Sequence, residues 1–105
     1  MAIDLKAIKL AAKSLADDAR QELPVDRVFL FGSYAKGTAT ELSDVDVCFF
    51  LKDYGGRERV DMIIRLLSLG GKYPDVFFEP IVFQTSEIER GNPFVKEIIR
   101  TGQEI

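Results

Sequence analysis

Two short apolar runs, joined by a connection of small polar residues, constrain the fold of this chain more than any other feature. Residues 28–31 lead directly into a Gly-Ser pair, and residues 45–51 begin beside two aspartates, Asp44 and Asp46. The first run is continuously apolar and the second is interrupted only by Asp46, and short apolar runs of this kind are typical of strands buried on both faces of a sheet. Because residues two apart in a strand point the same way, Asp44 and Asp46 are predicted to share one face, with Cα atoms about 6–7 Å apart.

The residues between the two predicted strands are suited to bind a phosphate group and a divalent cation. Gly32 lacks a Cβ atom, so its backbone can adopt a positive φ angle or come close to a ligand, and Ser33 adds a hydroxyl donor beside it. The oxygens of Asp44 and Asp46 are ligands that Mg²⁺ prefers. Together these groups indicate a phosphoryl-transfer site that holds a nucleoside triphosphate.

A signature is formed by Gly32-Ser33, ten intervening residues and Asp44-x-Asp46. It resembles the signature of the nucleotidyltransferases related to DNA polymerase β, and the short chain resembles their minimal branch. The ending, from Asn92-Pro93 to Gly102, also resembles the end of minimal nucleotidyltransferases. The resemblance therefore covers almost all of residues 1–105, and it implies a single domain with the nucleotidyltransferase fold.

The resemblance also implies a third carboxylate, on the strand beside the aspartate pair, that completes a site for two Mg²⁺ ions and accepts the proton of the attacking hydroxyl. Glu79 is the best-placed candidate, with one methylene more than the usual aspartate, and Asp75 is the fallback. The expected metal ligands and catalytic residues are Asp44, Asp46 and Glu79. If neither Glu79 nor Asp75 reaches the metal site, catalysis is expected to be weak or absent.

The candidate nucleotide-binding residues are Gly32, Ser33, Lys36 and Ser43. Gly32 and Ser33 are expected to hold the β- and γ-phosphates of ATP. Lys36 is placed to reach a phosphate as a point charge, with a plain exposed lysine as the alternative. Ser43 belongs to this set, although stabilising the turn before Asp44 is its main expected role.

Composition excludes several other classes of site. The chain has 14 basic and 17 acidic residues, interspersed, so a broad nucleic-acid-binding surface is not expected. Histidine is absent, which removes Ser-His-Asp catalysis and imidazole ligands, and the one cysteine, Cys48, is predicted to be buried. Neither a signal peptide nor an apolar run of membrane-spanning length is recognisable, and a cytoplasmic location is expected.

The pattern along the chain predicts a mixed α/β fold. Amphipathic helices are expected over residues 3–23, from about residue 60 to Gly70-Gly71, and from Pro93 to Gly102. A third strand is expected over residues 76–83, at a sheet edge or bulged because Pro80 cannot donate to a ladder. We therefore expect a small mixed sheet of about three principal strands, flanked by helices mainly on one face.

The leading functional hypothesis is a Mg²⁺-dependent enzyme that transfers a nucleoside monophosphate to a hydroxyl, with AMP from ATP as the expected donor reaction. A chain of 105 residues has little room for an acceptor-binding domain, so the acceptor site is expected to involve a second copy or a partner. The resemblance implies a small helical toxin of the HEPN class, adenylylated on a tyrosine, with this chain as its antitoxin. Two alternatives remain: a nucleotide-binding module that neutralises its partner by contact, and a transferase acting on a small molecule such as an aminoglycoside.

Overall fold

The structure is a computed structural model that describes residues 4–40 and 44–105. Its principal strands, β1 (Val25–Phe31), β2 (Val45–Leu51) and β3 (Phe78–Gln84), are joined by a two-residue strand, β4 (Gln103–Glu104), in one sheet of order β3-β2-β1-β4. β1 runs antiparallel to β2 and β4, whereas β2 and β3 are parallel. The prediction of a small mixed sheet with three principal strands is confirmed.

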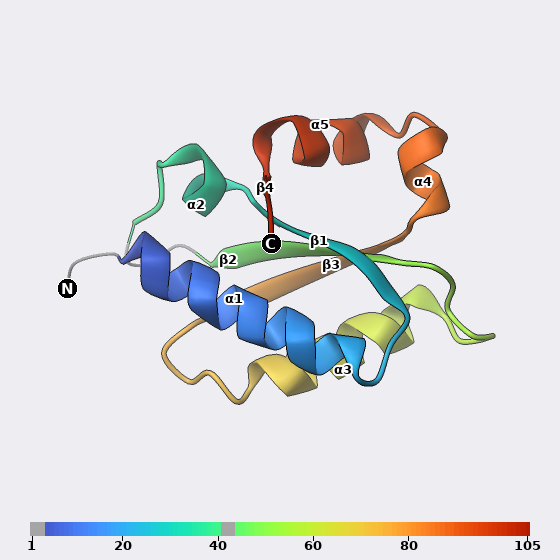
Figure 1. Ribbon diagram of the computed structural model, residues 1–105, viewed down its shortest axis with the longest axis horizontal. Coiled ribbons are helices and arrows are strands. Elements are labelled where there is room, and N and C mark those ends of the chain that lie inside the picture. The colour runs from blue at the N-terminus through green and yellow to red at the C-terminus, as the bar shows by residue number, and fades with distance from the viewer. Residues whose placement is uncertain (1–3, 41–43) are drawn as a thin grey trace.

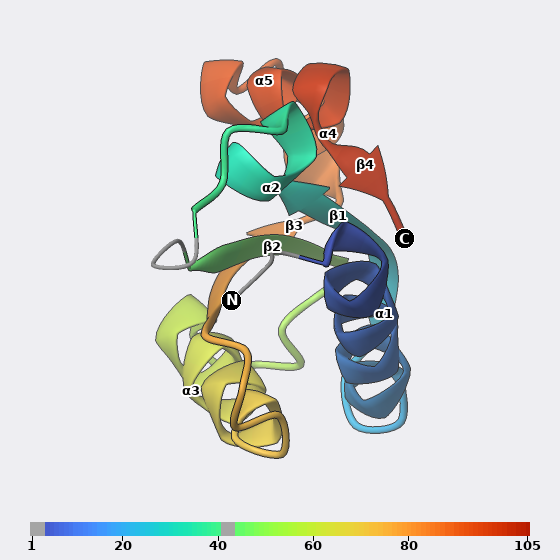
Figure 2. The same cartoon turned by 90° about the vertical axis from the view of Figure 1, so that its left-hand side faces the viewer.

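Helices lie on both faces of this sheet (Figures 1 and 2). The long helices α1 (Leu5–Arg20) and α3 (Arg59–Gly70) cover one face. The shorter helices α2 (Ser33–Lys36), α4 (Ser86–Glu89) and α5 (Pro93–Thr101) lie on the other. This second face is more covered than the sequence predicted, because α5 contributes the buried side chains of Val95 and Ile98 to a second apolar cluster.

The helix ends follow local signals in the sequence. The Asp4 carboxylate accepts hydrogen bonds from the N–H groups of Lys6 and Ala7 at 3.0 and 3.2 Å, which satisfies donors that the first turn of α1 leaves free. The Asn92 side chain caps α5 in the same way, with Pro93 in the first turn. Capping of this kind is worth about 1 kcal/mol per helix.

Most of the core lies between the sheet and the two long helices. Its fully buried side chains come from every element of this layer, and they include Leu15, Val28, Leu30, Val45, Val47, Phe49, Leu51, Met62, Leu66 and Val82. On the other face Phe29, Cys48 and Phe50 pack beneath α5. Burying a large apolar side chain contributes about 1.5–3 kcal/mol to the stability of the fold. The packed sheet therefore holds the residues at its strand ends in place. The prediction that Cys48 is buried is confirmed.

Helix α3 is apolar on two sides, which the sequence pattern did not resolve. The residues that signalled this helix include Val60, Ile64 and Leu67, but their exposed fractions are 52%, 59% and 52%. The buried side is formed by Met62, Leu66 and Leu69. A helical period locates a helix, whereas the side that packs inward is decided by the sheet and by α1.

Strand β3 lies at the edge of the sheet, which confirms the prediction based on Pro80. Part of this edge is already occupied, because Arg59 Nε donates a hydrogen bond of 2.6 Å to the Val82 carbonyl oxygen. The Arg59 guanidinium also lies over the Phe83 ring, 4.8 Å from its centroid.

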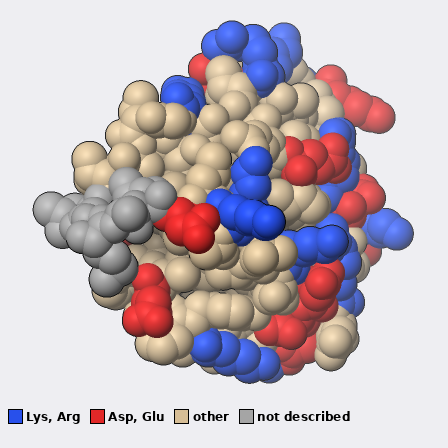
Figure 3. Space-filling model, turned by 60° about the vertical axis from the view of Figure 1, so that its left-hand side comes forward, with Lys and Arg blue, Asp and Glu red and all other residues tan. Residues whose placement is uncertain are grey.

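Charge is mixed over the face shown in Figure 3, where basic and acidic side chains are interspersed among uncharged ones. None of the helices in the described ranges combines the length and the apolar character that crossing a membrane requires.

Candidate functional site

The predicted site residues lie in a row across three adjacent strands, at one end of the sheet. Phe31, the last residue of β1, pairs with Asp46 of β2, and Asp46 is in turn the register partner of Glu79 on β3. Gly32 and Ser33 follow directly after Phe31. The row therefore runs from the Gly-Ser turn through Asp46 to Glu79, and paired residues of neighbouring strands point to the same face.

Gly32 is in direct contact with the carboxylate. Its φ angle is +72°, a conformation that side chains other than glycine rarely adopt, and a Cβ atom placed on it would collide with Asp46 Oδ2. The turn then continues into α2, where the Lys36 N–H donates to the Gly32 carbonyl oxygen at 3.0 Å. Glycine is required here both by backbone conformation and by space, so the Gly-Ser turn lies directly against the Asp46 carboxylate.

Asp46 is half-buried and surrounded by like charge. The pKa of Asp46 is raised from 3.8 to about 6, mainly by burial and in part by the neighbouring Glu79 carboxylate, through its charge and a hydrogen bond. The charge of Asp44 acts in the same direction. Burial and like charge both favour the protonated form of an acid, so this group is one that a cation would stabilise in its ionised form.

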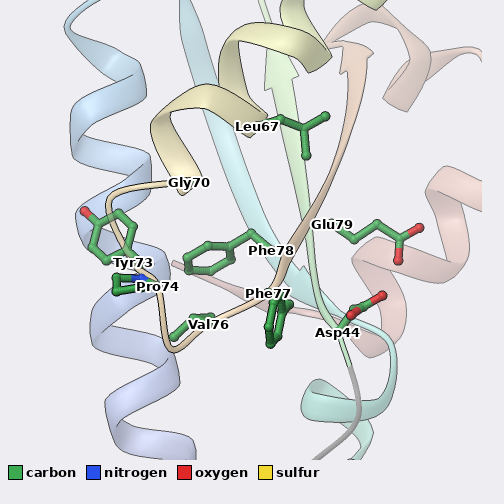
Figure 4. A pocket seen from close by; sticks show the side chains of 10 residues that line it. Asp44, Leu67, Gly70, Tyr73, Pro74, Val76, Phe77, Phe78 and Glu79 are labelled. Atoms are coloured by element: carbon green, nitrogen blue, oxygen red, sulfur yellow. The ribbon is translucent and has the colours of Figure 1, made fainter.

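Asp44 and Glu79 are exposed and line one pocket of about 420 Å³. Figure 4 shows their carboxylates extending to the same side of the two strands. Within the described residues, no three Asp, Glu, Cys or His side chains already converge as metal ligands. Asp44, Asp46 and Glu79 are therefore neighbours rather than a closed ligand set.

This group of carboxylates has the chemistry of a Mg²⁺ site. It offers oxygen ligands, and its negative charges are concentrated enough to perturb the Asp46 pKa. Asp75, the fallback third carboxylate, lies exposed in the turn before β3 and is not among the groups that shift the Asp46 pKa. The register thus favours Glu79 over Asp75 as the third carboxylate.

The other candidate nucleotide-binding residues do not belong to the row of register partners. Ser33 is partly exposed at the start of α2. Lys36 is exposed at the end of α2. The pKa of Glu97 on α5 is lowered mainly by a hydrogen bond from Arg100, and the charge of Lys36 acts in the same direction. Ser43 lies outside the described residues. The roles of Ser33, Lys36 and Ser43 remain predictions.

Sequence reasoning missed the apolar part of the pocket. Beside Asp44 and Glu79, its walls are formed by α3, by the turn that follows and by the start of β3, at Leu67, Gly70, Gly71, Tyr73, Pro74, Val76, Phe77 and Phe78. The one local signal was the Phe77-Phe78 pair, because alternation in a strand must turn one of two adjacent rings away from the core. Phe78 packs against the core and Phe77 is 72% exposed.

Comparison with known proteins identifies the family. The family model described as "Nucleotidyltransferase domain" matches residues 12–102, which includes every part of the row. This chain belongs to the nucleotidyltransferase domain family.

Relatives and solved structures agree with that assignment. A nucleotidyltransferase relative from Methanocaldococcus jannaschii, named "Putative protein adenylyltransferase", is 31% identical over 101 residues, 96% of this chain and 97% of that protein. A solved "putative minimal nucleotidyltransferase" has a TM-score of 0.62 at 24% identity, covering 96% of this chain and 95% of its own. A toxin-antitoxin structure with AMP-PNP has a TM-score of 0.58 at 19% identity, covering 90% of this chain and 68% of its own. At these identities the two structures show that the fold is shared.

Proposed function

We propose that this protein is a Mg²⁺-dependent adenylyltransferase that moves AMP from ATP to a hydroxyl group of a protein. The observation that carries the proposal is the row formed by Gly32, directly after β1, Asp46 on β2 and Glu79 on β3. A nucleotidyl transfer needs a phosphate-binding turn, metal-binding carboxylates and a proton acceptor in contact with one another. Family membership supports the reaction type, and the named relative supports a protein as the acceptor.

Each residue of the row has a distinct role in the proposal. Gly32 and Ser33 hold the β- and γ-phosphates, with Lys36 and Ser43 as further candidate contacts. Asp44, Asp46 and Glu79 hold two Mg²⁺ ions, which when bound offset the charge that develops on the phosphates. The acceptor oxygen bonds to the α-phosphorus, the bond from that phosphorus to the bridging oxygen breaks, and pyrophosphate leaves with the electron pair. The acceptor proton passes to the Glu79 carboxylate.

For the acceptor we propose a tyrosine of a small helical toxin of the HEPN class, with this chain as the antitoxin. The fold shared with a toxin-antitoxin structure that holds AMP-PNP is in keeping with such a pair. In this proposal the partner supplies part of the acceptor site.

A second candidate is a nucleotide-binding antitoxin that neutralises its partner by contact alone. The observation that favours it is that the three carboxylates are neighbours without forming a closed ligand set. The longer side chain of Glu79, compared with aspartate, is the second reason.

The deciding experiment follows the label from α-labelled ATP in the presence of Mg²⁺ onto proteins that co-purify from the native host. It compares the natural sequence with Asp46→Asn and with Asp75→Asn as the matched control. Label on a partner that is lost with Asp46→Asn and kept with Asp75→Asn supports the enzyme. A partner held inactive without label, equally by all three proteins, contradicts it and leaves the contact antitoxin.

A further inference from the structure

We propose that a docking surface for the acceptor protein is formed by Phe77, Leu67, Ile64 and Val60. The acceptor protein presents its hydroxyl from a segment that carries large apolar side chains. We name these four residues the apolar stripe. The inference rests on the proposed function, since it states from which side the acceptor reaches the α-phosphorus. It also predicts that the acceptor segment is apolar, which the carboxylates of the site alone do not indicate.

The direction of approach follows from the order of the strands. In an in-line displacement the attacking oxygen and the leaving group lie on opposite sides of the phosphorus. The leaving pyrophosphate is held by the Gly-Ser turn, after β1, and the carboxylates of β2 lie next to it. The attacking hydroxyl must therefore come from beyond Glu79 of β3, which is the edge strand.

The pocket lies on that side. It contains Asp44 and Glu79 at one end, and it continues around the edge of β3 to Leu67 on α3. In Figure 4 the Phe77 ring lies beside Asp44, and Leu67 lies higher in the view, beyond Glu79. Phe77 directly precedes the edge strand β3 and is 72% exposed. An aromatic ring of an acceptor residue can pack against Phe77 while its hydroxyl points toward Glu79.

The apolar surface extends beyond the pocket along α3. Val60, Ile64 and Leu67 are spaced by four and three residues, so they form one continuous line on the helix. All three are more than half exposed, although the inward side of α3 is fully packed by Met62, Leu66 and Leu69. This line is longer than a small-molecule acceptor requires. Its length indicates a protein segment with several apolar side chains, as in the binding of an amphipathic helix.

The first test is an NMR titration of the ¹⁵N-labelled protein in the presence of Mg²⁺ and AMP-PNP. N-acetyl-tyrosinamide is the probe, and N-acetyl-serinamide is its control, because it has a hydroxyl without a ring. We expect the tyrosine compound to shift the amide signals of Leu67, Phe77 and Phe78, and we expect Phe77→Ala to reduce these shifts several-fold. Shifts that are absent, or that cluster around the exposed ring of Phe94 instead, overturn the inference.

The second test is the transfer of label to host proteins by Ile64→Glu and Leu10→Glu variants. Leu10, on α1, is 60% exposed and outside the stripe, so it matches Ile64, which is 59% exposed. We expect Ile64→Glu to lose at least tenfold in labelling and Leu10→Glu to stay within about twofold. Both variants should keep the Kd of the natural protein for Mg²⁺·ATP.

The remaining outcomes separate this inference from the proposed function. Equal labelling by both variants overturns the stripe and leaves the enzyme. ATP binding without transfer to any protein or to the tyrosine compound overturns the proposed enzyme, and with it the stripe as an acceptor surface. Dimerisation in sedimentation velocity that only Ile64→Glu abolishes assigns the stripe to a second copy and overturns the inference. If AMP-PNP shifts neither Gly32 nor Ser33, the proposed function itself fails.

Discussion

Asp46→Asn should make the protein more stable at pH 8 in the absence of divalent metal. In the folded protein the pKa of Asp46 is raised from 3.8 to about 6, chiefly by burial. At about 1.4 kcal/mol per pH unit, the rise corresponds to at most roughly 3 kcal/mol of unfavourable free energy. Because this carboxyl is only half-buried, solvent screening reduces the figure, and we expect a gain of about 1 kcal/mol.

The gain should depend on pH with a defined sign. An acid whose pKa is higher in the folded state binds more protons folded than unfolded between pH 3.8 and about 6. The natural protein therefore loses stability as the pH rises through this window, and above about 6 the full cost is present. The advantage of Asp46→Asn should be largest at pH 8, fall to about half at pH 5 and disappear near pH 4.

The assay is thermal and urea unfolding in EDTA, at pH 5 and pH 8, with Asp75→Asn as the control. A gain of 1 kcal/mol raises the Tm of a domain of this size by about 4–8 °C. Asp75 is exposed in a turn, and its variant removes the same charge, so it controls for the change in net charge. Adding Mg²⁺ with AMP-PNP should reverse the order, since a ligand that binds only the folded state stabilises the natural protein. A lower stability of Asp46→Asn at pH 8, or a gain that is the same at both pH values, would refute the reasoning.

Four further predictions concern single residues. Gly32→Ala should cost roughly 1–3 kcal/mol in urea unfolding and weaken Mg²⁺·ATP binding in calorimetry, because a Cβ atom there is strained and collides with Asp46. Glu79→Gln should lower the rate of AMP transfer by about 10²- to 10⁴-fold while ATP still binds, as expected for loss of a proton acceptor. Leu66→Ala should cost about 2–5 kcal/mol of unfolding free energy, since this side chain is fully buried. Cys48 should react with a thiol reagent at pH 8 only after unfolding, because burial raises its pKa to about 12.

The elements that the sequence predicts well are those defined by local chemistry. Asn92 and Pro93 identify the start of α5, and the apolar run beside the aspartates identifies β2, because caps and periodicity act within a few residues. That Gly32 lies close to Asp46 can also be predicted from the sequence. The two strands are joined by a short connection and pair in antiparallel register.

Features that depend on long-range packing could not be derived. The resemblance already placed Glu79 ahead of Asp75, but the pairing of Glu79 with Asp46 depends on the register of the parallel strands β2 and β3, which α3 separates along the chain. The strand β4 has only two residues and is held by pairing with β1 and by the ion pair of Arg27 with Glu104, at 2.8 Å. No local sequence pattern predicts a strand of this length. The outward side of α3 is hidden from the sequence for the same reason, since both of its sides are apolar.

Two features of this protein are unfavourable for the isolated chain, and both lie at the same end of the fold. Asp46 is a half-buried carboxylate with Glu79 and Asp44 as neighbours, and the exposed apolar stripe reaches the same pocket through Leu67 and Phe77. Stability alone would favour a neutral side chain at Asp46 and polar ones on the stripe. Local violations of folding rules are expected where a ligand compensates for them. In the function that we propose, a cation would compensate for the first and an apolar protein segment for the second, and a transfer from ATP to a protein hydroxyl would require both at adjacent places.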